Sequence, residues 1–125
     1  MSLSSLDPNP SWDPDAYTDE LTTLNRIADD ITINIWGADW CSDCRRVLPD
    51  FGAALQNLDL DSDQVNVYPV TQEKEGPLVD EYEIDRIPTI VLEYQGEEIG
   101  RFVENEKVPA IVYFANRIED IRTIK

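Results

Sequence analysis

Two cysteines separated by two residues, Cys41 and Cys44, stand between two strongly patterned segments, and this junction limits the folds open to the chain. Before it, residues 31–36 alternate β-branched and other side chains, which predicts a strand ended by Gly37. After it, apolar residues recur with helical spacing over residues 47–58, which predicts a helix of about four turns, bent at Pro49. The cysteines are therefore expected at the start of a helix that follows directly on a strand.

The remaining pattern predicts alternating helices and strands. We expect helices over residues 17–29 and 77–82, strands over 65–70 and 89–94, and a returning strand over 97–103 after a Gln95-Gly96 hairpin turn. A last helix is expected over 108–121, with Asn105 as its cap and Pro109 in its first turn. This order predicts an α/β fold with a mixed sheet of about four strands, parallel at first and antiparallel at the hairpin, between layers of helices.

The chain has 125 residues, which is enough for one domain with its own core. Residues 1–16 contain three prolines and no apolar run, so we expect a flexible N-terminal tail followed by a domain over 17–125. These residues do not have the pattern of a signal peptide, and no apolar stretch approaches 18 residues. A cytoplasmic location without membrane insertion is expected.

Charge excludes several function classes. The chain carries 26 acidic against 10 basic residues, a formal net charge of −16, which argues against nucleic acid and anionic membranes as partners. It contains no histidine, which excludes a Ser-His-Asp enzyme and removes the commonest metal ligand and general base. The bases are mostly arginine, and acid-rich, lysine-poor surfaces resemble those of proteins from salt-loving organisms. We expect a halophile as the source; an ordinary acidic cytosolic protein is the alternative.

The cysteine pair has three interpretations. A structural disulfide would close a loop of only four residues, worth about 2 kcal/mol by loop entropy. A zinc site needs four ligands, and the chain supplies no second pair, so such a site would require a dimer. A redox dithiol is favoured by position, because backbone N–H groups at a helix N-terminus stabilise the first thiolate while the second thiol lies one turn further on. We therefore expect no metal.

At this point the chain resembles the thioredoxin superfamily from about Tyr17 to Arg122. The resemblance rests on a motif around the cysteines, on a proline five residues after the pair, on a tripeptide before a distant strand and on a hairpin glycine: Ala38-Asp39-Trp40-Cys41-Ser42-Asp43-Cys44-Arg45-Arg46, Pro49, Ile87-Pro88-Thr89 and Gly96. It implies a thioredoxin-like fold. It also implies that Cys41 is the nucleophile and that Cys44 resolves the mixed disulfide.

The same resemblance implies the surroundings of the pair. Pro88 would be cis and face the disulfide, the backbone at Ile87 would bind an extended substrate, and Trp40 would be a partly exposed ring beside the thiols. No cofactor is implied beyond the redox-active Cys41–Cys44 disulfide. The partners implied are protein disulfides and a flavoprotein donor of the thioredoxin-reductase type, and we expect a monomer.

Several residues depart from the family pattern. Ser42 and Asp43 replace Gly-Pro between the cysteines, and the charge of Asp43 should raise the pKa of a nearby thiol, which favours a reductant. Ile35 occupies the position of the family's buried aspartate, so proton transfer is left to water, Asp39, Asp43 or no group at all. Arg45 is either a solvated helix residue or a positive charge near the sulfurs.

The function predicted from these features is thiol–disulfide exchange with protein disulfides, with the dithiol acting as a reductant. The alternative is a non-catalytic binding module that holds an extended peptide segment in the groove beside Pro88.

Overall fold

A computed structural model describes residues 3–73, 75–103 and 107–124, and its centre is a four-stranded sheet in the order β2-β1-β3-β4. The strands are β1 (Ile31–Gly37), β2 (Val65–Pro69), β3 (Thr89–Tyr94) and β4 (Glu97–Val103). β1 pairs with β2 in parallel, whereas the β1–β3 and β3–β4 pairs are antiparallel. The predicted mixed sheet of four strands flanked by helices is confirmed.

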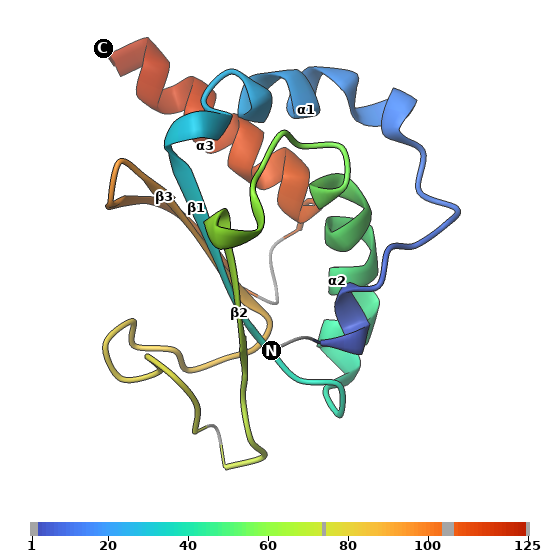
Figure 1. Cartoon of the computed structure of the whole chain (residues 1–125), viewed down its shortest axis with the longest axis vertical. Helices are drawn as coiled ribbons and strands as arrows, with labels where there is room; N and C mark the ends of the chain where they lie inside the picture. The colour runs from blue at the N-terminus through green and yellow to red at the C-terminus, as the bar shows by residue number, and fades with distance from the viewer. Residues whose placement is uncertain (1–2, 74, 104–106, 125) are drawn as a thin grey trace.

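Three α-helices cover one side of this sheet, which Figure 1 shows nearly edge-on: α1 (Thr18–Asn25), α2 (Ser42–Leu55) and α3 (Ala110–Ile124). Short 3-10 turns occur at Ser4–Leu6, Pro14–Tyr17, Ala28–Asp30 and Ser62–Gln64. α1 and α2 both contact α3. Pro109 directly precedes α3, while the cap expected at Asn105 lies outside the described residues. No helix of the described segments is long and apolar enough to cross a bilayer.

The alternation in β1 directs buried side chains to both sides of the sheet. Ile31, Ile33 and Ile35 are at most 2% exposed and belong to the main hydrophobic cluster. Trp36 points to the opposite side, where its ring stacks on Tyr68 at 5.0 Å and contacts Tyr82 at 4.8 Å between centroids. Both faces of this central strand are therefore buried, which fixes the register of β1 in the sheet. The cysteine segment follows directly after the end of β1.

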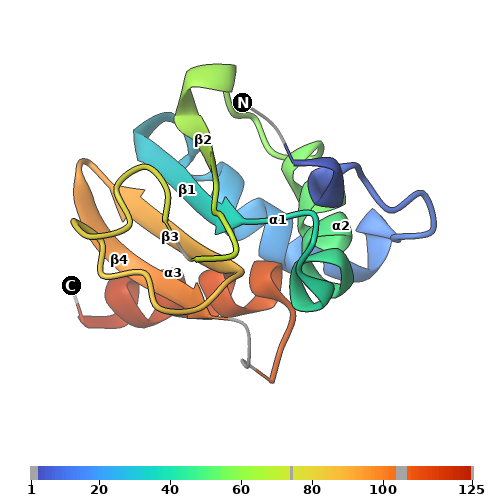
Figure 2. The same ribbon diagram turned by 90° about the horizontal axis from the view of Figure 1, so that it is seen from below.

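The helix predicted over residues 77–82 is wrong. This segment is a series of turns in which Leu78 has φ 60° and Glu83 has φ 54°, left-handed values that interrupt a helix. The carbonyl of Pro77 accepts a hydrogen bond of 2.8 Å from Trp36 Nε1 and is not part of a helical ladder. The second face of the sheet is therefore covered by turns rather than by a helix, as Figure 2 shows for the connection between β2 and β3.

The hairpin after β3 agrees with its sequence signal. Gln95 and Gly96 join β3 to β4, and both have positive φ, 52° and 84°. Two left-handed residues are the requirement of the tight two-residue turn that matches strand twist. β4 is thereby held beside β3, and α3 packs against β4.

The segment for which the sequence predicts a flexible tail is described from Leu3 onward and lies along α2. The Asn9 amide donates to the carbonyl of Pro49 at 3.0 Å, and its side chain donates to Asp50 at 2.8 Å. A Cβ on Gly52 would collide with the carbonyl oxygen of Leu6, so the close approach of the two backbones requires a glycine there. α2 runs through Pro49 without interruption from Ser42 to Leu55.

Candidate active site

The two cysteines lie where β1 passes into α2. Cys41 is the N-cap of α2, with extended backbone angles of φ −88° and ψ 121°, and its Sγ accepts a hydrogen bond of 3.3 Å from the Cys44 amide. A sulfur therefore occupies the place in which a serine or aspartate oxygen usually satisfies the first amides of a helix. Both cysteines are free thiols.

The surroundings of the two thiols differ. Cys41 is 9% exposed, whereas Cys44 is fully enclosed at 0%. Burial raises the pKa of the Cys44 thiol to about 12, and the hydrogen bond with Cys41 and the charge of Asp43 act in the same direction. At neutral pH Cys44 is therefore protonated, and Cys41 is the thiol that a disulfide can reach from solvent.

A distant part of the chain completes the site. Cys41 Sγ lies 3.7 Å from the carbonyl oxygen of Ile87, as donor to acceptor, across a separation of 46 positions. The Ile87–Pro88 peptide bond is cis. Ile87 is 6% exposed and Pro88 is fully buried directly before β3. The structure thus brings together the cysteine segment and the Ile87-Pro88 pair that the sequence selected separately.

Trp40 lies at the edge of the same site. Its side chain is 44% exposed, and its Nε1 donates a hydrogen bond of 3.2 Å to the carbonyl of Val70 after β2. This bond anchors the ring at one end and leaves an apolar surface beside Cys41 open to solvent.

Asp39 and Arg45 each bind other groups of the protein. Asp39 accepts hydrogen bonds from the amides of Ser4 at 3.2 Å and Ser5 at 2.9 Å, and from the Ser5 hydroxyl at 2.9 Å. The Ser5 and Ser4 amides hold the pKa of the Asp39 carboxyl below its ordinary value. Arg45 donates to the backbone carbonyl of Asp39 at 2.8 Å.

Asp43 forms an ion pair of 3.1 Å with Arg46 on the solvent side of α2. The Arg46 side chain is 64% exposed and the Asp43 side chain 42%, so solvent screens this pair and it contributes little to stability. The charge of Asp43 adds a small increase to the Cys44 pKa, which burial raises most.

The buried position that carries an acid in the resembled family is apolar here. Ile35 is 0% exposed and offers no group that could accept the Cys44 proton. Among the residues that the structure describes, no three acidic or cysteine side chains gather in a manner suited to a metal ion.

Two contributors to the site escaped sequence analysis. Leu3 packs over Gly37 beside Cys44, and Ser5 binds Asp39. The only sequence signal for the Leu3 contact was Gly37, because a glycine at the end of a buried strand leaves a space that another side chain must fill. Nothing in residues 1–16 indicated which side chain that would be.

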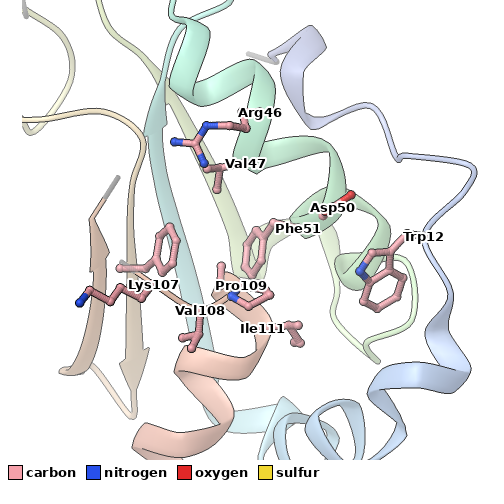
Figure 3. A pocket seen from close by; sticks show the side chains of 11 residues that line it. Trp12, Arg46, Val47, Asp50, Phe51, Lys107, Val108, Pro109 and Ile111 are labelled. Carbon is pink, nitrogen blue, oxygen red and sulfur yellow. The ribbon is translucent and has the colours of Figure 1, made fainter. Parts of the chain in front are cut away.

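A separate pocket of about 250 Å³ lies between α2, the start of α3 and Trp12. Figure 3 shows Arg46 and Val47 on one side of it, with Val108 and Pro109 on the other. None of the site residues selected from the sequence lines this pocket. It borders the part of α2 that follows Cys44 and is distinct from the cysteine site.

Comparison with known proteins gives consistent matches. A family profile described as thioredoxin matches residues 13–117. A thioredoxin of Chlamydia pneumoniae is 29% identical over 77 residues, which cover 62% of this chain and 72% of that protein. A Schizosaccharomyces pombe protein that carries the name "putative protein disulfide-isomerase" is 27% identical over 96 residues, which cover 75% of this chain. This chain spans only 19% of that protein's length.

The fold also matches solved structures. The structure of thioredoxin 1 from Thermosipho africanus superposes with a TM-score of 0.53 at 25% sequence identity. The superposition covers 74% of this chain and 96% of that one. The match therefore extends over nearly the whole of that protein.

Proposed function

Because the chain belongs to the thioredoxin family, we propose that it is a thiol–disulfide oxidoreductase that reduces protein disulfides through Cys41 and Cys44. The observation that carries the proposal is the asymmetry of the pair. Cys41 is the more exposed thiol and receives a helix N–H, whereas Cys44 is enclosed and its pKa is about 12. Cys41 is thus placed to attack a client disulfide, whereas Cys44 stays protonated until the second step.

The exchange takes two steps. The Cys41 thiolate attacks one sulfur of a client disulfide, the client S–S bond breaks, and the released client sulfur takes up a proton from water. Cys44 then gives its proton to water and attacks Cys41 Sγ, which breaks the mixed disulfide, and the departing client sulfur takes up a proton from water to leave as the second client thiol. Two electrons pass to the client, and Cys41 and Cys44 end as a disulfide.

The first step also prepares the second. In the reduced state the hydrogen bond with Cys41 and the electrostatic influence of Cys41 both raise the Cys44 pKa. Once Cys41 is part of a mixed disulfide, it carries no charge and its sulfur is a poorer acceptor for the Cys44 thiol proton, so both contributions diminish. The Cys44 pKa should fall at the stage at which its thiolate is needed, without a buried carboxylate at Ile35.

We assign client binding to the rim formed by Trp40, Ile87 and Pro88. Trp40 offers an exposed ring anchored at Val70, and the Ile87 carbonyl lies within 3.7 Å of Cys41 Sγ. An extended client segment lying along this rim would bring its disulfide next to Cys41. Asp39, Asp43 and Arg45 bind other protein groups and act indirectly.

The proposed direction is reduction of the client. A neighbouring acid and a high pKa of the second thiol disfavour the thiolate form, which favours the disulfide of this protein and hence electron donation. Return to the dithiol is assigned to a flavoprotein of the thioredoxin-reductase type. The proposal places a monomer in the cytoplasm, where thiols are kept reduced.

The test is reduction of insulin disulfides by dithiothreitol, together with equilibration against glutathione. We expect catalysis by the natural chain and by the matched control Ser42→Ala, loss of catalysis in Cys41→Ser, and a potential of about −270 mV or lower, the value typical of thioredoxin. Unchanged catalysis in Cys41→Ser, or a potential near −120 mV, which is typical of an oxidant, would overturn the proposal.

A second candidate is favoured by one observation. Cys44 is completely enclosed, and Ile35 offers it no carboxylate partner. A protein that only binds extended segments needs neither an accessible second thiol nor a group that accepts its proton. This binding module would hold its partner equally well in Cys41→Ser and in the natural chain, and its dithiol would not exchange with glutathione.

A further inference from the structure

The first residues of the chain lie beside the cysteine pair. In Figure 1 the 3-10 turn Ser4–Leu6 lies against α2, near the helix end that carries the cysteines. Its position is fixed by the close approach of the Leu6 carbonyl to Gly52 and, further along, by the bonds from Asn9 to Pro49 and Asp50. These contacts attach the segment along α2.

Leu3 fills a space over the end of β1. A Cβ placed on Gly37 would lie 3.1 Å from Leu3 Cδ1, 3.2 Å from Leu48 Cδ1 and 3.4 Å from Cys44 Sγ. The Leu3 side chain, the Leu48 side chain and the buried thiol therefore converge over a residue that has no side chain of its own. Leu3 is 5% exposed although it stands third in the sequence.

The residues after Leu3 bind the cysteine loop. Both oxygens of the Asp39 carboxylate receive backbone amides, Oδ2 from Ser4 and Oδ1 from Ser5, and Oδ1 also receives the Ser5 hydroxyl. Asp39 lies two residues before Cys41, and Arg45 donates a hydrogen bond of 2.8 Å to the backbone carbonyl of Asp39. Leu3 and the loop that carries Cys41 are thus connected through one carboxylate.

We propose that Leu3, Ser4 and Ser5 form a positioning element of the redox site, in which Leu3 closes the solvent side of Cys44 and Asp39 holds Leu3 in place. The inference deepens the proposed function, on which it rests for its biological meaning. Its physical content is that the N-terminal segment controls the access of water to the resolving thiol.

The mechanism is desolvation. A thiol enclosed by Leu3, Leu48 and the end of β1 has no water to stabilise its thiolate. If Leu3 leaves, the space over Gly37 fills with water, and the Cys44 thiolate becomes both more accessible and easier to form. Asp39 supplies the attachment, because its two oxygens satisfy the first free amides of the segment.

The direct test measures Cys44 alone, in a Cys41→Ser background where serine still caps α2. Alkylation by iodoacetamide at pH 8 reports the reactive thiolate. We expect Leu3→Ala to raise the rate about threefold or more, since a fall of about half a unit in pKa raises the thiolate fraction about threefold. Leu3→Met, which nearly conserves volume, should restore the original rate.

The matched control is Leu21→Ala in α1, whose side chain is 9% exposed and belongs to a helix that contacts α3. It removes the same atoms from a similarly buried site. We expect it to lower stability without raising the alkylation rate under conditions that favour the folded state. Equal increases in Leu3→Ala and Leu21→Ala would show that general loosening exposes Cys44, and would overturn the proposal.

A double-variant comparison tests the link through Asp39. Asp39→Asn keeps the shape of the side chain but removes its charge, so it should raise the Cys44 alkylation rate in the same direction as Leu3→Ala. If both act by releasing one segment, the double variant should be no faster than the faster single variant. Rates that multiply, or an Asp39→Asn rate equal to the original, would contradict a single positioning element.

These measurements remain informative if the proposed function fails. Alkylation of Cys44 requires no client and no disulfide exchange, so an inactive protein still reports the effect of Leu3. Conversely, catalysis through Cys41 with a Cys44 rate insensitive to Leu3 would support the function and reject the positioning element.

Discussion

At the level of single residues, the site depends on the different surroundings of two chemically identical thiols, which differ in exposure and in hydrogen-bond partners. Cys41 accepts the Cys44 amide and contacts the Ile87 carbonyl, whereas Cys44 is surrounded by the core. The chain has no histidine, and Ile35 is apolar, so backbone amides and burial are the main influences on the pair. Burial is the largest influence on Cys44, and it suppresses the thiolate of this thiol.

This difference gives the reduced protein a pH-dependent stability. The pKa of Cys44 rises from an ordinary 9.0 to about 12 on folding, so its stabilising contribution is complete below pH 9 and is lost as the pH rises toward 12. We expect the urea midpoint of the reduced natural chain to fall between pH 8 and pH 11 more steeply than that of Cys44→Ser. Parallel curves for the two proteins would contradict a buried, protonated Cys44.

At the scale of elements, α2 joins the redox pair to the N-terminal segment. Its first turn carries the cysteines, and Gly52 in its later half admits the Leu6 backbone. A helix glycine usually weakens a helix, and its replacement by alanine gains up to about 1 kcal/mol. Here the same change should have the opposite sign.

Gly52→Ala is therefore expected to destabilise the protein, because the new Cβ collides with the Leu6 carbonyl and displaces the segment that holds Leu3. The loss should exceed about 1 kcal/mol, a typical cost of overpacking, and can be measured by urea unfolding. Ala54→Gly, a change in the same helix, serves as a reference for helix propensity. A gain in stability in Gly52→Ala would mean that the segment does not press on α2.

The elements also show what sequence patterns can and cannot predict. β1, β3 and the Gln95-Gly96 hairpin were predicted from alternation and turn chemistry, because these signals are local. The helix predicted over 77–82 was wrong, because the left-handed Leu78 and the bond from Trp36 to the Pro77 carbonyl belong to a series of turns. Pattern cannot report such long-range contacts.

The site divides in the same way. Cys41 and Cys44 could be selected from their spacing, and Pro88 from its resemblance to the family motif. The packing of Leu3 over Gly37 could not be predicted, because the two residues are 34 positions apart. The one sequence signal for this contact is the glycine itself. The direction of Asp39 toward Ser4 and Ser5 was equally invisible in the sequence.

At the scale of the whole molecule, the surface charge sets the conditions under which the fold holds. The net charge of −16 is spread over an accessible surface of 7090 Å². Like charges repel over about 30 Å at 0.01 M salt but only about 10 Å at 0.1 M. Dilute buffer should therefore weaken the fold, and the scarcity of lysine is consistent with the halophilic source that we propose.

The corresponding expectation is a melting temperature that rises between 0.02 M and 2 M KCl. Most of the rise at low salt reflects screening of acidic side chains, and a further rise at molar salt would indicate adaptation to brine. Differential scanning calorimetry of the reduced protein measures both parts. Equal melting temperatures at the two salt concentrations would reject the halophilic assignment.

In the proposed reaction, Cys41 attacks a client disulfide and Cys44 resolves the product. The most direct measurement is mass spectrometry of the mixed disulfide formed with a defined disulfide-bonded peptide, comparing Cys44→Ser with Cys41→Ser. We expect a stable adduct on Cys41 in Cys44→Ser and none in Cys41→Ser, where the remaining thiol is enclosed. An adduct on Cys44 in Cys41→Ser that forms as fast, or no adduct in either variant, would contradict it.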